Sequence, residues 1–185
     1  MPVLTEILDG NIALVTMSGK SATQSFSMEF LPEIAAAIDS ALSDKSVKGL
    51  VITGDGKFFS AGADINAFAE AIEQNEAPKL IRELTGVLHP LISRMRQSPT
   101  ICVAAINGAC AGGGLGLALA CDVRIASPQA KIAASYSGMG LSPDGGTTWL
   151  LPRLVGNQVS RRFFFENAIW LSLIHISEPT RPSRI

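Results

Sequence analysis

Residues 101–124, ICVAAINGACAGGGLGLALACDVR, constrain the fold of this chain more than any other stretch. An apolar, β-rich run over residues 101–106 breaks at Asn107-Gly108, a strong turn dipeptide. Three glycines, 112–114, then lead into an apolar segment at 115–121 that we expect to be a buried helix. Glycine exposes backbone N–H groups, and those at a helix N-terminus have no partner within the helix. This corner is therefore predicted to stabilise negative charge developing on an oxygen atom.

Two other interpretations of the same stretch are less consistent with its residues. Residues 99–121 contain no charged residue, and glycines 108, 112 and 116 are spaced as on the face of a paired membrane helix. Asn107-Gly108 and the glycine triplet would interrupt such a helix in its middle, and no second apolar span accompanies it. A dinucleotide-binding G-x-G-x-x-G that opens a helix is not found. Close packing of a buried helix on a sheet is compatible with the oxyanion role.

Two glycine-containing motifs together resemble a known family. AINGACAGGGLGLALACD, residues 105–122, and GKFFSAGADI, residues 56–65, resemble the signatures of the crotonase (enoyl-CoA hydratase/isomerase) superfamily, and the resemblance extends over about residues 12–165. It implies the α/β crotonase-like (ClpP/crotonase) fold, a repeated ββα superhelical core, here incomplete at the C-terminus. It also implies an acyl-CoA thioester as substrate, with CoA part of the substrate and no other cofactor, and a homotrimer or hexamer for a full-length protein.

The rest of the chain alternates strands and helices within one layered domain. We expect strands at 3–8 and 12–17, joined as a hairpin through Asp9-Gly10-Asn11, and further strands at 47–53, 123–126 and 131–134. Helices are expected at 32–42, 78–97 and 147–154, and loops at 18–25 and 138–146. The helix at 78–97 has an apolar stripe of Leu80, Leu84, Leu88, Leu91 and Met95. Residues 1–170 are interpreted as a truncated acyl-CoA-binding domain. Residues 171–185, LSLIHISEPTRPSRI, lose amphipathic periodicity and resemble a translated sequencing adapter, so we interpret them as a non-native tail. Without further helices, apolar residues should be exposed at Trp149, Leu150 and 163–165.

Composition excludes several classes of protein. The net charge is −1, with 15 Lys plus Arg against 16 Asp plus Glu, which gives no basic footprint for nucleic acid. The three cysteines, 102, 110 and 121, are odd in number and lack C-x-x-C spacing, so neither a disulfide framework nor a zinc site is predicted. Residues 1–10 show no signal peptide, which predicts a cytoplasmic protein without a membrane anchor.

The resemblance assigns roles to several residues. It implies that the N–H groups of Ala61 and Gly113 bind the thioester oxygen, where they would stabilise an enolate. It implies that CoA lies near Lys57, Ala63, Asp64 and Ile65, and Gly112 is expected against the bound substrate. Tyr136 is expected to line the acyl pocket or to donate a hydrogen bond there, with an ordinary core residue as the alternative. Asp64 is equally well explained as a helix N-cap, and Lys57 as a solvated lysine. His89 is expected at the surface or in an interface.

The chain departs from the hydratase pattern at both glutamates that activate water. Gly116 and Tyr136 stand at those positions, and neither residue can act as a carboxylate base. Asp144, in GLSPDGG, matches the position of the base in the isomerase branch, which includes Δ3,Δ2-enoyl-CoA and ring-epoxide phenylacetyl-CoA isomerases. The sequence therefore favours an acyl-CoA isomerase of fatty acid or phenylacetate metabolism. A turn role for Asp144, a hydratase, a thioester hydrolase and an inactive acyl-CoA-binding homologue stay open.

Overall fold

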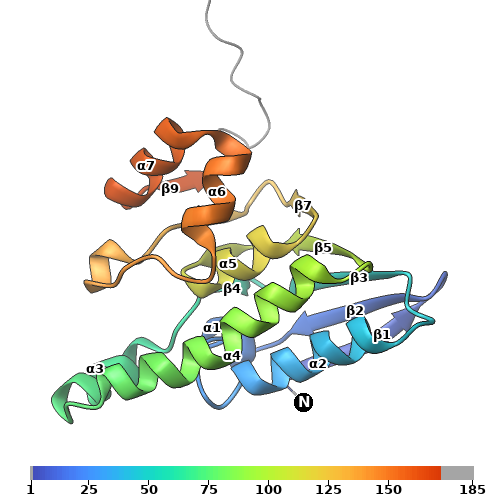
Figure 1. Cartoon of the computed structure of the whole chain (residues 1–185), viewed down its shortest axis with the longest axis horizontal. Helices are drawn as coiled ribbons and strands as arrows, with labels where there is room; N and C mark the ends of the chain where they lie inside the picture. Colours follow the sequence, from blue (N-terminus) through green and yellow to red (C-terminus); the bar gives the residue numbers. More distant parts are fainter. Residues whose placement is uncertain (1, 172–185) are drawn as a thin grey trace, which may run out of the picture.

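The computed structural model describes residues 2–171, which form two β-sheets with helices packed between and around them (Figure 1). The larger sheet has the order β1-β2-β3-β5-β7, and only its first pair is antiparallel. That pair is the predicted hairpin, which turns through Gly10 and Asn11 at φ 79° and 63°. The strands of this sheet are β1 (Val3–Leu8), β2 (Ile12–Met17), β3 (Gly49–Gly54), β5 (Ile101–Ile106) and β7 (Val123–Ala126).

The smaller sheet has the order β4-β6-β8-β9. Each of its first three strands follows a strand of the larger sheet along the chain and leads towards a helix, which is the predicted ββα repeat. Its strands are β4 (Phe58–Ser60), β6 (Ala109–Ala111), β8 (Lys131–Ala133) and β9 (Ile169–Leu171). Leu171, the first residue of the predicted tail, pairs with Lys131 of β8. The rest of the predicted tail, 172–185, lies outside the described residues.

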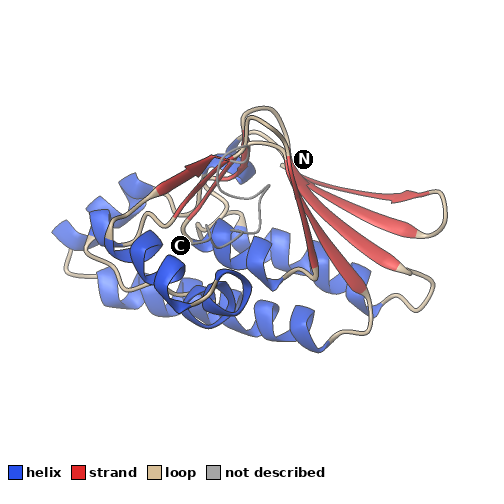
Figure 2. Ribbon diagram, turned by 90° about the horizontal axis from the view of Figure 1, so that it is seen from above, coloured by secondary structure: helices blue, strands red, loops and turns tan. Residues whose placement is uncertain are grey.

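Helices cover one face of the larger sheet (Figure 2). Every second residue of β2 and β3 is buried against them, including Val15, Leu50 and Ile52. This alternation follows from the two-residue period of a strand. A short helix, α1, replaces part of the loop predicted at 18–25. The helices are α1 (Lys20–Thr23), α2 (Leu31–Ser43), α3 (Ile65–Glu73), α4 (Ala77–Gln97), α5 (Gly113–Ala120), α6 (Thr147–Val155), α7 (Asn157–Phe165) and a 3₁₀ turn at Ser137–Met139.

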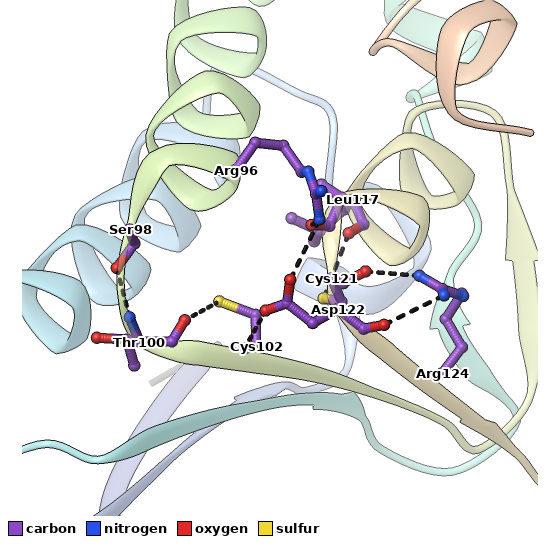
Figure 3. Close-up of polar contacts among 9 residues, drawn as sticks. Arg96, Ser98, Thr100, Cys102, Leu117, Cys121, Asp122 and Arg124 are labelled. Carbon is purple, nitrogen blue, oxygen red and sulfur yellow. Dashed lines mark hydrogen bonds and ion pairs between the residues drawn. The ribbon is translucent and has the colours of Figure 1, made fainter. Parts of the chain in front are cut away.

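Polar groups anchor the C-terminal end of α5, the helix that follows the glycine triplet (Figure 3). Asp122 accepts a hydrogen bond from the Cys102 N–H (2.9 Å) and forms an ion pair with Arg96 (3.2 Å). Arg96 and Arg124 also donate to the last carbonyls of this region, those of Ala120 and Cys121. Cations at this end of a helix complement its dipole. The helix is therefore held at the end opposite to the glycines.

Only some of the apolar residues that were predicted to be exposed on the C-terminal helices are exposed. Trp149 and Phe165 are 63% and 83% exposed, as predicted, and Leu150 is partly buried. Phe163 is fully buried, against the prediction, because its ring packs 4.3 Å from that of Trp170 in β9. All three cysteines are free and buried. None of the helices within residues 2–171 is long and apolar enough to cross a membrane.

Candidate active site

The fold brings the two glycine-containing motifs side by side. Strand β4, from the first motif, pairs in parallel with β6, from the second. The Asn107 amide ties them together, since it accepts from the Gly54 N–H (3.0 Å) and donates to the Phe58 carbonyl (3.1 Å). A Cβ atom at Gly114 would lie 2.3 Å from Ser60 Oγ, so glycine is required for this close approach. Both motifs therefore end at the same edge of the small sheet.

The backbone amides at this edge differ from the prediction in one respect. The Ala61 N–H donates to the Ala22 carbonyl at 2.9 Å, so it is engaged inside the fold and does not fit the predicted oxyanion role. The N–H groups of Ala63 and Gly113 have no hydrogen-bond acceptor among residues 2–171. Gly113 is the first residue of α5, where such a free N–H is normal. Sequence spacing could not separate Ala61 from Ala63, because only the contact with α1 distinguishes them.

Ala63 and Gly113 line a cavity of about 470 Å³. Its wall is mainly apolar and comes from both motifs, from α3 and α4, and from the loop before α6. An apolar cavity with few polar groups is typical of a small-molecule site. Its lining residues are Phe26, Ala61, Ala63, Ile65, Phe68, Ile81, Leu84, Thr85, Leu88, Gly112, Gly113, Ser135, Tyr136, Met139, Leu141, Ser142, Pro143 and Asp144.

Asp144 is the only carboxylate among these lining residues. Its carbonyl accepts two hydrogen bonds from Thr147, from the N–H (3.0 Å) and from Oγ1 (2.8 Å), which fix the start of α6. Gly145 and Gly146 follow at φ 57° and 72°, a left-handed conformation that favours glycine. Burial raises the pKa of the Asp144 carboxyl, while hydrogen bonding by the Tyr136 side chain and the proximity of His89 lower it. A carboxylate made more basic by burial is suited to accept a proton from carbon.

His89 lies closer to the site than the sequence suggested. It is exposed on α4, as predicted, but its Nε2 atom is 3.4 Å from the Gly145 N–H, which donates to it. The two residues are 56 positions apart, and no local pattern links them. The α4 residues of the cavity wall, such as Leu84 and Leu88, belong to the predicted apolar stripe of that helix. Their role in a site was not predicted, because a stripe of this kind usually packs in the core.

Helix α5 packs directly against the Asp144 loop. A Cβ atom at Gly116 would lie 2.7 Å from the Gly145 carbonyl oxygen. Any residue larger than glycine at this position, including glutamate, would therefore displace the loop. Tyr136, at the other position where hydratases carry a glutamate, is 5% exposed and lines the cavity. Burial, followed by the charge of Asp144, raises the pKa of its phenol.

The remaining predicted site residues have different surroundings. Ile65 and Gly112 line the cavity. Asp64 is the N-cap of α3: it accepts from the Asn66 and Ala67 N–H groups, and its second oxygen accepts from Gln24 at 2.9 Å. Hydrogen bonds within the fold therefore use both oxygens of the Asp64 carboxylate. Lys57 is exposed and lies outside the cavity wall.

A repeated ββα core with two free amides above an apolar cavity defines the crotonase class of fold. Residues 8–167 match the model of the enoyl-CoA hydratase/isomerase family, and the chain belongs to this family. A crystal structure of enoyl-CoA hydratase from Bacillus halodurans superimposes with a TM-score of 0.84 at 26% identity, covering 94% of this chain and 68% of that chain.

Two curated relatives carry different activities in their names. "Probable enoyl-CoA hydratase EchA14" of Mycobacterium tuberculosis is 41% identical over 160 residues, 86% of this chain and 60% of the relative. The 1,2-epoxyphenylacetyl-CoA isomerase of Escherichia coli is 32% identical over 156 residues, 84% of this chain and 59% of the relative. The chain therefore spans about 60% of the length of these two relatives. Family membership leaves both hydration and isomerisation as possible reactions.

Proposed function

We propose that this protein isomerises an acyl-CoA thioester through an enolate, with Asp144 as the base. The proposal assigns the thioester oxygen to the N–H groups of Ala63 and Gly113, in place of the predicted pair of Ala61 and Gly113. Both donors belong to the backbone, so they need no reorganisation as charge develops on the oxygen. Preorganised donors of this kind contribute about 2.7–4 kcal/mol each to transition-state stabilisation.

Asp144 then accounts for the proton movements. Its carboxylate removes a proton from the carbon next to the thioester, and the electron pair moves onto the thioester oxygen as a dienolate forms. Asp144 then returns the same proton to the γ-carbon. The carbonyl re-forms, and the double bond now lies between the α- and β-carbons. No proton is gained or lost overall, so one carboxylate is enough. The observation that carries the proposal is that Asp144 is the only carboxylate in the cavity wall.

The surroundings of Asp144 argue against hydration by a pair of carboxylates. Restoring a glutamate at position 116 would require the Asp144 loop to move, because the Gly145 oxygen occupies that space. Tyr136 fills the second position with a neutral phenol. A water molecule would therefore lack the two carboxylates that hydratases use.

Hydration by another arrangement is the second candidate function, and the name of the M. tuberculosis relative favours it. The E. coli relative adds ring-1,2-epoxyphenylacetyl-CoA to the substrates worth testing. Thioester hydrolysis and acyl-CoA binding without catalysis remain further alternatives. Hydration and hydrolysis predict different products in the same assay, and binding without catalysis predicts none.

The test compares the wild type with Asp144→Asn on a panel of 3-enoyl-CoA, 2-enoyl-CoA and ring-1,2-epoxyphenylacetyl-CoA thioesters. We expect isomerised product from the wild type and a loss of about 10²–10⁴-fold in the variant, the usual contribution of a general base. Acyl-CoA binding, measured by calorimetry, should persist in the variant. Asp9→Asn, which removes an exposed carboxylate in the first hairpin turn, is the control and should keep full activity. Hydratase turnover that is unaffected by Asp144→Asn would overturn the proposal.

A further inference from the structure

Tyr136 carries a buried hydroxyl group that the proposed mechanism does not use. Its side chain is 5% exposed and lies in the cavity wall beside Asp144. A phenol that is removed from water needs a hydrogen-bond partner, because leaving its donor unpaired is costly. The position of this hydroxyl relative to Asp144 therefore matters for the base.

The neighbouring carbonyl is a poor partner for this hydroxyl. Tyr136 Oη lies 3.5 Å from the Asp144 carbonyl oxygen, a long distance for an O–H donor. That oxygen already accepts two shorter bonds from Thr147, at 2.8 and 3.0 Å, which use both of its lone pairs. The Asp144 carboxylate and the Thr147 hydroxyl are the other side-chain hydrogen-bond partners of this phenol. The Tyr136 side chain lowers the pKa of the Asp144 carboxyl, against the effect of burial.

The loop holds the tyrosine in place independently of any substrate. The Tyr136 carbonyl accepts the N–H groups of Met139 and Leu141, both at 3.0 Å. Ser135, just before it, has φ 59°, and its N–H donates to Asn167 Oδ1 at 3.0 Å. A non-glycine residue held at positive φ indicates that its surroundings fix its conformation. The phenol is thus directed towards the cavity by the backbone that carries it.

We propose that Tyr136 is a positioning residue for the base: its hydroxyl donates to the Asp144 carboxylate, orients it towards the substrate carbon and favours its ionised form. This inference rests on the proposed function, in which Asp144 accepts the proton. A fixed donor on one carboxylate oxygen leaves the other oxygen free to approach the substrate. Charge-assisted hydrogen bonds of this kind are among the stronger ones in proteins.

Few other groups act on Asp144. From α4, His89 faces it and also favours the ionised form. Helix α5, GGLGLALA, contains no ionisable residue. On α6, Arg153 lies over the Trp149 ring, at 3.1 Å from its centroid, and makes no contact with the carboxylate. The effect of removing the phenol hydroxyl should therefore be separable from that of removing His89.

The test is Tyr136→Phe, which removes the hydroxyl and keeps the ring that fills the wall. Carboxyl ¹³C NMR of Asp-labelled protein follows the titration of Asp144 without substrate, and its signal is assigned from its loss in Asp144→Asn. We expect the titration midpoint to rise by about one to two pH units, since a hydrogen bond to an ionised group is lost. The acid limb of the pH–rate profile should move upward equally, and kcat should fall about tenfold with KM unchanged.

Thr85→Val is the matched control, because its hydroxyl also lines the cavity but donates to the Ile81 carbonyl within α4 (2.7 Å). Its Asp144 midpoint should equal that of the wild type. An unchanged midpoint in Tyr136→Phe, or an equal shift in Thr85→Val, would overturn the inference. So would a raised KM without a shift of the profile, which would indicate contact with the substrate instead. The NMR readout needs no turnover, so its outcome is independent of whether the reaction is an isomerisation.

Discussion

At the scale of single residues, Asp144 is placed where stability and function oppose each other. Burial disfavours its charged form, while the proposed reaction requires that form. The pKa of Asp144 is raised in the folded protein, so the folded state binds this proton more tightly than the unfolded chain does. The contribution of protonated Asp144 to the free energy of unfolding is therefore fully present below the pKa of this group in the unfolded chain. It is lost as the pH rises through the pKa of Asp144 in the folded protein.

Asp144→Asn should therefore be at least as stable as the wild type at neutral pH, because it removes a buried charge. At a pH below both pKa values the two proteins should converge, since wild-type Asp144 is then neutral as well. Urea unfolding at several pH values measures this difference. A variant that is less stable at pH 7 but not in acid would show that the carboxylate is stabilised by the fold.

At the scale of secondary-structure elements, α5 connects the proposed oxyanion amides to the proposed base. Gly113 supplies an amide at its first turn, and Gly116, one turn later, meets the loop that carries Asp144. Its other end is held by Asp122, Arg96 and Arg124. The distance between the amide and the carboxylate therefore depends on how closely this helix and the loop pack.

Gly116→Ala should displace the loop, because the new Cβ atom would lie 2.7 Å from the Gly145 oxygen. We expect it to lower the free energy of unfolding by about 1–3 kcal/mol, as overpacking does. Activity should fall by up to about 100-fold, the cost of a misplaced catalytic group. Gly86→Ala is the control: its Cβ would meet nothing within 4 Å on the exposed side of α4, and it should stabilise the helix by about 1 kcal/mol. Equal unfolding midpoints and equal activities for both variants would contradict this account of the α5 contact.

At the scale of the whole molecule, large apolar side chains remain exposed on the C-terminal helices. Trp149 is 63% exposed on α6, and Phe165 is 83% exposed at the end of α7. Exposed apolar surface of this kind favours association. The homotrimer implied by the family resemblance stays a proposal for this protein.

Light scattering coupled to size-exclusion chromatography should reveal concentration-dependent self-association of this chain. Phe165→Ser should lower the average mass at a fixed concentration, because it removes the most exposed aromatic ring. Ile72→Ser is the control, since Ile72 is 64% exposed but lies on α3, away from these helices. An equal effect of both changes would show that association is not localised to α6 and α7. A discrete mass three times 19.5 kDa would support the trimer.

Local patterns in the sequence were sufficient for the family and for many of the elements, although they did not predict α1, α7 or the short strands β4, β6 and β9. The hairpin followed from alternation around Asp9-Gly10-Asn11, the long helix from its apolar stripe, and the cap at Asp64 from its place before a helical run. The two glycine motifs identified the superfamily. Five of their glycines lie where backbone or side-chain atoms approach closely: Gly62, Gly108, Gly113, Gly114 and Gly116. These features depend on residues near one another in the chain, and therefore leave a local signal.

Only the tertiary structure decided which groups face the cavity. The engagement of the Ala61 N–H depends on Ala22, the contact of His89 depends on Gly145, and the burial of Phe163 depends on Trp170. The partner of the Tyr136 hydroxyl likewise depends on how Thr147 occupies the Asp144 carbonyl. Apart from the last, these contacts join different parts of the fold. The number of residues between the partners differs from contact to contact, so no local sequence pattern predicts them. A residue's type and neighbours in sequence set what it can donate or accept, but packing determines which partner it meets.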